Sequence, residues 1–202
     1  MAQSGRFDAE RFDAAYYRRF YGDPRTRVAD RASTDRLVTF VVAYARFLGL
    51  PLRHVLDLGC GPGLWRAALR RRAPRARYHG VEVSAWLCRR FGWRPGSAVD
   101  YAPGRTFDLV VCQGVLQYLD DRDATAAIDN LGRLARGALY VEALTDRDWK
   151  ENCDRGVTDG DVNLRPLDWY RRRLARSFVA LGGGLFLRRD AGIPTFELET
   201  PG

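Results

Sequence analysis

The stretch HVLDLGCGPGLW, residues His54 to Trp65, places three glycines within five residues directly after a short apolar run. The run contains one carboxylate, Asp57, two residues before the first glycine. A strand that ends in a tight glycine turn and continues as a helix is typical of the ligand-binding end of an open α/β sheet. The turn Gly59–Gly63 is therefore expected at the carboxyl end of the first strand, beside a ligand.

The residues that follow alternate between short apolar runs and helical patterns. Strands are expected at 53–58, 78–83, 96–99, 107–112 and 137–143, and helices at 62–72, 84–91 and 122–136. Repeated strand–helix–strand units imply parallel pairing with right-handed crossovers. The sequence thus predicts an α/β fold of three layers around a doubly wound, mostly parallel sheet of seven strands.

Both ends of the chain add to this core. Helices are expected at 7–21 and 33–48. A further helix is expected at about 166–181, and GGGLFLRRDAGIPTFELE (182–199) predicts an antiparallel C-terminal hairpin with a Gly-Pro turn. Residues 1–50 are predicted to be an added helical cap over the ligand, and residues 51–202 the ligand-binding domain itself.

The position of Asp57 restricts the ligand. A dinucleotide would place its pyrophosphate on the glycine turn, where Asp57 repels it and Pro62 removes an amide donor. No Lys-Ser/Thr follows the glycines, which excludes a P-loop. Glu82 lies 23 residues beyond Gly59, at the end of the second strand, where a carboxylate can accept both ribose hydroxyls. A ribose, an ammonium group and no phosphate at the turn fit S-adenosylmethionine.

VLDLGCGPG, GVEVS and FDLVVCQGVLQYLDD, in this order and spacing, resemble the class I S-adenosylmethionine-dependent methyltransferases over about residues 53–144. The resemblance implies that the glycine turn holds the methionine moiety through backbone groups and that Glu82 binds the ribose. It also implies that residues after the fourth strand lie along the sulfonium. The implied cofactor-binding residues are Asp57, Gly59, Cys60, Gly61, Gly63, Glu82, Val83, Ser97, Ala98, Cys112, Gln113 and Val115.

The chain departs from this family after the third strand. The family often has Gly-Asp-Ala there, and the Asp accepts a hydrogen bond from the adenine amino group. GSAVD places Ser97 at that position. Either Ser97 and backbone amides suffice or Asp100 reaches the adenine, and we expect Ser97.

The sequence contains fewer signals for the residues that bind the methyl acceptor. Gln117-Tyr118 stands where many small-molecule methyltransferases carry His-His, so Tyr118 and Glu142 are the candidate catalytic residues. Packing under the loop is the alternative for Tyr118, and balancing an arginine is the alternative for Glu142. Tyr17, Tyr21 and Trp149 are the candidate substrate-binding residues. The N-terminal aromatic residues either form a lid over the cofactor or pack on the sheet.

The predicted function is methyl transfer from S-adenosylmethionine to a small molecule. The alternatives are an RNA, DNA or protein methyltransferase and a catalytically silent S-adenosylmethionine-binding protein. A net charge of +8 and six arginines in 66–77 favour nucleic acid. That run, however, lies on the far part of a helix leaving the glycine turn, and CQGV replaces the Asn-Pro-Pro-Tyr-like tetrad of base-methylating enzymes. Nucleic acid is not the expected partner.

The composition and the N-terminal sequence indicate where the protein is located and whether it binds a metal. With 46% hydrophobic residues the chain can build a core, and no apolar run approaches the about 18 residues of a membrane span. The N-terminus lacks a signal core, so a cytoplasmic protein is expected, as a monomer or homodimer with no membrane partner. The four cysteines show no metal-ligand spacing, which predicts reduced thiols and no metal site.

Overall fold

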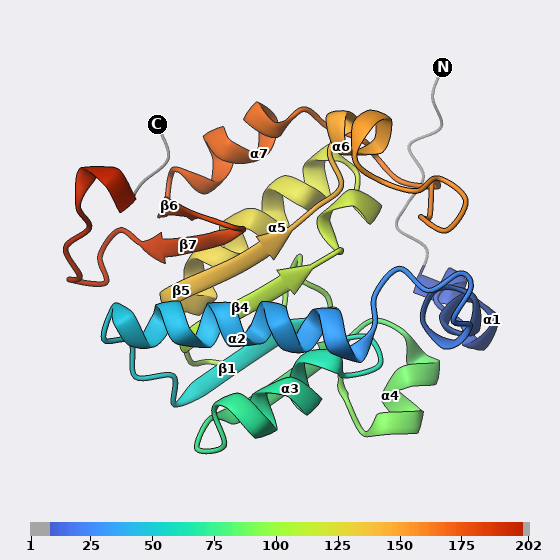
Figure 1. The fold of residues 1–202 in the computed structure, drawn as a ribbon, viewed down its shortest axis with the longest axis horizontal. Helices are drawn as coiled ribbons and strands as arrows, with labels where there is room; N and C mark the ends of the chain where they lie inside the picture. Colours follow the sequence, from blue (N-terminus) through green and yellow to red (C-terminus); the bar gives the residue numbers. More distant parts are fainter. Residues whose placement is uncertain (1–8, 200–202) are drawn as a thin grey trace.

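The computed structural model describes residues 9–199 (Figure 1). Its helices and turns of helix are η1 (Ala9–Arg11), α1 (Ala14–Tyr17), η2 (Arg18–Gly22), α2 (Arg31–Phe47), α3 (Leu64–Arg72), α4 (Ala85–Phe91), η3 (Leu116–Tyr118), α5 (Asp121–Leu134), α6 (Asp146–Glu151), α7 (Leu167–Leu174) and η4 (Glu197–Glu199). Its strands are β1 (His54–Leu58), β2 (Arg77–Glu82), β3 (Arg94–Pro95), β4 (Phe107–Gln113), β5 (Ala135–Glu142), β6 (Phe178–Gly182) and β7 (Leu185–Arg188). Among the described helices, none is both long and apolar enough to cross a membrane.

The strands form one sheet in the order β3-β2-β1-β4-β5-β7-β6. The pairs among β1 to β5 are parallel, whereas β7 is antiparallel to both β5 and β6. The strand order reverses between β1 and β4, and in such sheets the carboxyl ends of these two strands flank a binding crevice. The predicted fold class is confirmed, including the antiparallel hairpin at the C-terminal end.

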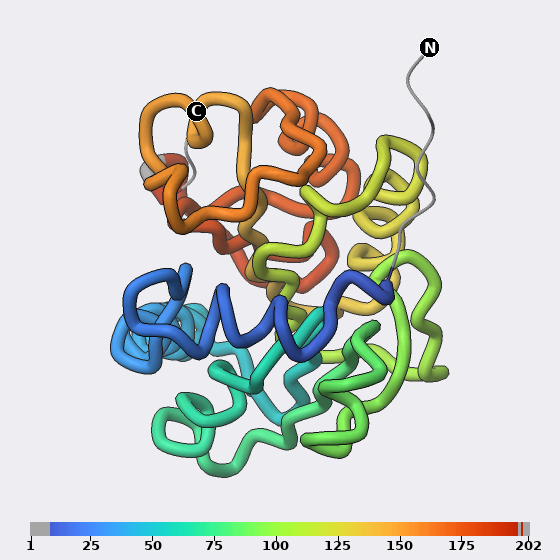
Figure 2. Tube along the Cα trace, turned by 90° about the vertical axis from the view of Figure 1, so that its right-hand side faces the viewer, coloured from blue at the N-terminus to red at the C-terminus, as the bar shows by residue number. Residues whose placement is uncertain are grey.

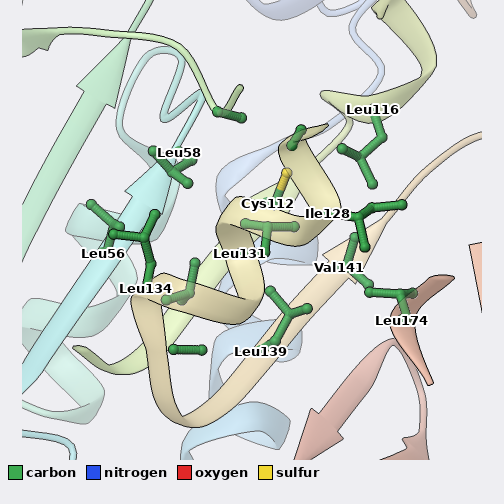
Figure 3. Close-up of a cluster of buried hydrophobic side chains, with 14 of the residues drawn as sticks. Leu56, Leu58, Cys112, Leu116, Ile128, Leu131, Leu134, Leu139, Val141 and Leu174 are labelled. Atoms are coloured by element: carbon green, nitrogen blue, oxygen red, sulfur yellow. The ribbon is translucent and has the colours of Figure 1, made fainter. Parts of the chain in front are cut away.

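Helices cover both faces of this sheet, because successive strand residues point to opposite faces. Leu109 and Val111 of β4 pack with α2 and α3, while Val110 and Cys112 pack with α5. Figure 3 shows Cys112 in the second of these clusters, among leucines of the sheet and of α5. The two cores hold the sheet rigidly and leave its carboxyl edge for the site.

The predicted third strand, tail helix and C-terminal hairpin differ in position from the structure. The third strand was expected at 96–99, but β3 covers only Arg94–Pro95, since the chain turns where the N–H groups of Asp100 and Tyr101 donate to the Ser97 carbonyl. The predicted tail helix ends early, and its last residues form β6 instead. The hairpin therefore turns at Gly182–Gly184, whose φ angles are all positive, and the expected Gly-Pro turn lies outside it.

The N-terminal addition is less regular than predicted. The first predicted helix, 7–21, begins at two residues outside the described chain and continues as η1, α1 and η2, interrupted where Asp13 caps α1. We call residues 9–22 the aromatic segment, after Phe12, Tyr16, Tyr17, Phe20 and Tyr21. Figure 2 shows it crossing the open edge of the molecule, between α3 and α4 below and residues 144–166 above.

Candidate active site

The glycine turn after β1 depends on the absence of side chains. Gly59, Gly61 and Gly63 have φ angles of 73°, 51° and 81°, a region that L-residues with side chains rarely adopt. A Cβ on Gly59 would lie 2.4 Å from Val115 Cγ2, and one on Gly63 would lie 2.8 Å from Trp93. The turn therefore fits closely between the loop after β4 and the residue before β3.

Trp93 fixes the same turn from the side. Its indole Nε1 donates a hydrogen bond to the Gly61 carbonyl at 2.9 Å, and its ring fills the space beside Gly80. Trp93 was not predicted from the sequence as a residue of the site. The available signal was a tryptophan three residues before the predicted third strand (96–99), but nothing local connects it with a turn 32 residues away.

Glu82 ends β2 and points back at the glycine turn. Its Oε2 accepts the Gly61 N–H at 2.8 Å, and its Oε1 accepts the N–H groups of Val83 and Ser84 at 2.9 and 3.0 Å. Burial raises the pKa of Glu82, and these three backbone donors oppose that rise, as does the hydroxyl of Tyr17. Three backbone donors and the Tyr17 hydroxyl use the about four acceptor positions of this carboxylate, so a ligand hydroxyl on Glu82 would compete with Tyr17.

Replacing Glu82 by alanine is expected to weaken S-adenosylhomocysteine binding by roughly 1.5–3 kcal/mol, the scale of hydrogen bonds to a charged group. Isothermal titration calorimetry measures the change, and circular dichroism checks that the variant is folded. An unchanged affinity in a folded variant removes Glu82 from the ribose site.

Asp57 lies at the floor of the turn in a buried position. The Tyr78 hydroxyl donates to its Oδ2 at 2.6 Å. Burial raises the pKa of Asp57 to about 7, although the Tyr78 hydrogen bond acts in the opposite direction. A cationic group placed beside Asp57 would favour its ionised form and be held by it.

This pKa makes cofactor binding depend on pH. If Asp57 in its ionised form pairs with the ammonium group of the cofactor, the affinity for S-adenosylhomocysteine should rise through pH 7 and be about tenfold weaker at pH 6 than on the plateau. In the protein without ligand, the raised pKa means that the folded state binds the Asp57 proton more tightly than the unfolded state does. This contribution to folding stability is present at low pH and is lost as the pH rises through about 7. Calorimetry at pH 6, 7 and 8 tests the binding effect. Asp57→Asn should give a flatter profile, and an identical slope in this variant contradicts the assignment.

Two cavities meet at this edge of the sheet. The narrow cavity, about 60 Å³, is lined by the aromatic segment, the glycine turn, Glu82, Val83, residues 96–98 and residues 113–115. The wide cavity, about 470 Å³, extends from the glycine turn past Gln113 and Glu142 to residues 143–159. Asp57 and Cys60 line the wide cavity, and Tyr21 and Tyr118 line both.

The volume of the narrow cavity shows whether a nucleoside fits there. Ligand pockets usually measure about 300 Å³ or more, so the narrow cavity is too small while Phe12 and Tyr17 fill it. Tyr17 is buried and stacks on Trp86 with ring centroids 6.0 Å apart. The turn and Glu82 suit an adenosine and a methionine moiety, provided that the aromatic segment shifts.

Glu142 belongs to a chain of side-chain hydrogen bonds at the floor of the wide cavity. Trp65 Nε1 donates to Gln113 Oε1 at 2.7 Å, and Gln113 Nε2 donates to Glu142 Oε2 at 3.2 Å. The Tyr140 hydroxyl donates to the same Glu142 oxygen at 2.9 Å. Gln113 and Glu142 are register partners at the ends of β4 and β5, so the network fixes a carboxylate next to the switch point.

Tyr118 joins the loop after β4 to the aromatic segment. Its hydroxyl lies 2.8 Å from that of Tyr16, and its ring packs edge-on against Phe12. Burial raises the pKa of Tyr118, so at neutral pH its hydroxyl keeps its proton. Tyr118 can therefore donate a hydrogen bond into the cavities.

Some of the other predicted site residues line the cavities, and others do not. Ser97 and Ala98 line the narrow cavity, whereas Asp100 lines neither cavity. Gly63 faces a separate surface hollow, and Cys112 lies wholly inside the core on the α5 face (Figure 3), because strand alternation directs it away from Gln113. Trp149 also lines neither cavity and packs on Gly160, which leaves its neighbours Asp148 and Cys153 to form the wall.

Two buried side chains that the sequence analysis missed hold the loops of the site. Arg165 is 4% exposed, donates to the carbonyls of Leu116 and Leu119, and pairs with Asp121 at 2.7 Å. Asn130 of α5 donates to the Ala98 carbonyl at 3.0 Å. Both position loops that line the cavities.

The comparisons with known proteins agree with this geometry. A family model for a methyltransferase domain matches residues 56–137. A trans-aconitate 2-methyltransferase of Azoarcus sp. (strain BH72) is 36% identical over 94 residues, which are 43% of this chain and only 37% of that protein. The match thus spans little more than a third of this curated relative.

Solved structures share the fold over almost the whole chain. A sugar N-methyltransferase from Streptoalloteichus sp. matches with a TM-score of 0.63 at 20% identity, over 93% of this chain and 96% of that one. A magnesium protoporphyrin IX methyltransferase from Synechocystis PCC 6803, solved with bound S-adenosylmethionine, matches with a TM-score of 0.60 at 21% identity, over 93% and 100% of the two chains. With the glycine turn, Glu82 and the strand order, these matches lead to one conclusion. Residues 56–137 match a methyltransferase domain, and the chain has the fold of the class I S-adenosylmethionine-dependent methyltransferases.

Proposed function

We propose that the protein transfers a methyl group from S-adenosylmethionine to a small molecule. The observation that carries the proposal is the wide cavity of about 470 Å³, which opens directly from the glycine turn. Its size suits a small organic acceptor. Curated relatives and structural neighbours act on such molecules, a tricarboxylate in one case and a sugar in another.

The chain's own residues mainly bind, orient and exclude water. When bound, the cofactor supplies an activated methyl group. The glycine turn and Glu82 hold its two ends, and aromatic side chains around the turn keep water out of the reaction volume. Tyr118 is proposed to donate a hydrogen bond, and Glu142 to accept one from the acceptor.

We further propose that the aromatic segment, and not α2, acts as the lid of this site, because α2 packs on the face of the sheet. The aromatic segment buries Phe12, Tyr17 and Phe20 against the core. Arg11 ties it to the opposite wall through ion pairs with Asp159 and Asp161, each at 3.0 Å. The closed segment occupies the ribose position, so it has to open for the cofactor to enter.

The variant Tyr17→Phe tests this lid. Without the hydroxyl that competes for Glu82, the affinity for S-adenosylhomocysteine should rise by a few-fold, because a hydrogen bond contributes about 0.5–1.5 kcal/mol. Thermal unfolding and calorimetry on the same protein separate stability from binding. Tyr44→Phe, on α2 and outside both cavities, is the matched control. A weaker affinity in Tyr17→Phe with unchanged stability would show that the hydroxyl contacts the cofactor.

Methyl transfer itself is tested by the release of S-adenosylhomocysteine. The protein is incubated with S-adenosylmethionine and separate pools of small amines, alcohols and carboxylic acids, with transfer RNA, duplex DNA and a mixed protein substrate as further arms. Release with a small-molecule pool is expected. Release only with nucleic acid or protein overturns the proposed acceptor class, and cofactor binding without release in any arm favours a silent binding protein.

A further inference from the structure

The wide cavity is negatively charged in a chain of opposite bias. The protein carries 33 basic and 25 acidic residues. Among the described residues, however, Asp57, Glu142, Asp148 and Asp159 line the wide cavity, and no lysine, arginine or histidine does. A carboxylate-bearing acceptor would find acidic side chains there and, among the described lining residues, no basic side chain to bind.

Three of these carboxylates already have partners. Asp159 pairs with Arg11 at 3.0 Å. Asp148 caps α6, accepting the Thr145 hydroxyl at 2.6 Å and the Asn152 side-chain amide at 2.8 Å. Asp57 accepts the Tyr78 hydroxyl beneath the glycine turn. Each of these three carboxylates therefore already has an ion pair or hydrogen bonds within the protein.

Glu142 differs from the others. Its side chain is exposed to the cavity, and both of its hydrogen bonds, from Gln113 and Tyr140, end on Oε2. Within the described part of the chain no basic group forms an ion pair with it and Oε1 accepts no hydrogen bond. The network through Trp65 and Gln113 fixes this free oxygen in place. It is a preformed acceptor for an N–H donor, most strongly for a charged one.

Aromatic side chains of the same cavity suit a cation as well. Tyr16, Phe20 and Tyr21 of the aromatic segment line the same cavity. Aromatic faces attract ammonium groups, and they bind anions poorly. A carboxylate and aromatic rings in one cavity are features that recognise an amine.

We propose that the acceptor is a small uncharged scaffold bearing a primary or secondary amine, and that Glu142 Oε1 binds its ammonium form. This rests on the proposed methyltransferase function and specifies its acceptor. After the ammonium loses a proton to solvent, the nitrogen lone pair forms the new N–C bond to the methyl group, and the electron pair of the breaking C–S bond goes to sulfur. The methylated ammonium product then releases its proton to solvent. An acceptor such as the trans-aconitate named for the curated relatives would lack a basic partner among the described lining residues and would be repelled by Glu142.

The test uses the full chain saturated with S-adenosylhomocysteine and matched probes. Glucosamine, glucose and glucuronate, and then cyclohexylamine, cyclohexanol and cyclohexanecarboxylate, are titrated by calorimetry. In each series the amine should bind most tightly and the carboxylate most weakly. Glu142→Gln should weaken amine binding by about tenfold or more, with S-adenosylhomocysteine affinity and melting temperature unchanged. Glu151→Gln, an acid on α6 outside the cavity, is the matched control and should bind amines normally.

Turnover provides the second readout. S-adenosylhomocysteine release from S-adenosylmethionine should occur with amines, and kcat/KM should rise with pH toward the pKa of the amine. The inference is overturned if no amine binds better than its matched alcohol, if carboxylates are the methylated class, or if Glu142→Gln leaves amine affinity unchanged. Failure to bind S-adenosylmethionine at all would instead overturn the proposed function.

Discussion

Replacing Gly59 by alanine should lower the free energy of unfolding by about 2–5 kcal/mol and weaken cofactor binding about tenfold or more. Two costs add. A side chain at a φ of 73° enters the left-handed region, and its Cβ would lie 2.4 Å from Val115 Cγ2. To relieve the contact with Val115, the glycine turn or the loop after β4 has to move. Both of these border the expected cofactor position. Urea unfolding and calorimetry with S-adenosylhomocysteine measure the two effects.

Gly49→Ala is the matched control for this variant. Gly49 has a φ of 74°, but no atom lies within 4 Å of its added Cβ. It carries only the backbone cost, about 1–2 kcal/mol, and lies far from the site at the end of α2. Equal losses in the two variants, with cofactor affinity kept in both, would show that Val115 does not constrain the turn.

Replacing Arg165 by methionine should destabilise the protein by about 1–3 kcal/mol, the scale for depriving buried carbonyl groups of a charged hydrogen-bond donor. The guanidinium satisfies carbonyls of Leu116 and Leu119 and pairs with Asp121. Methionine fills similar space but donates no hydrogen bond, so the Leu119 carbonyl loses the Arg165 donor and the Leu116 carbonyl keeps only the Leu119 N–H at 3.3 Å. Because the carbonyls belong to the loop that carries Gln117 and Tyr118, KM for the acceptor should rise more than the Kd for the cofactor.

Arg147→Met provides the comparison for Arg165. Arg147 also forms an ion pair at 2.7 Å, with Glu151, but both side chains are mostly exposed. Exposed pairs contribute about 0–1 kcal/mol, so this variant should unfold close to the wild type. A loss for Arg165→Met no larger than for Arg147→Met contradicts the positioning role.

What the sequence could predict follows from the range of each interaction. The strand, the glycine turn and Glu82 were predictable because each is marked by residues adjacent in the chain. Trp93 and Arg165 were not, since their partners lie 32 and 46–49 residues away. The apolar run 178–181 fits a helix end and a short strand equally well, and only pairing with β7 decides for β6. Cys112 and Trp149 were assigned to the site by position along the chain, but orientation within the fold turns both away.

The most direct test of the account is a crystal structure of the full chain with S-adenosylhomocysteine. The account predicts the ribose hydroxyls on Glu82, the adenine beside Ser97, and the methionine moiety on the glycine turn with its ammonium group toward Asp57. It also predicts that Tyr17 is displaced from Glu82 and that the wide cavity remains open beside the sulfur. A ligand bound elsewhere, or a ribose that leaves the Tyr17 hydroxyl in place and does not touch Glu82, would contradict it.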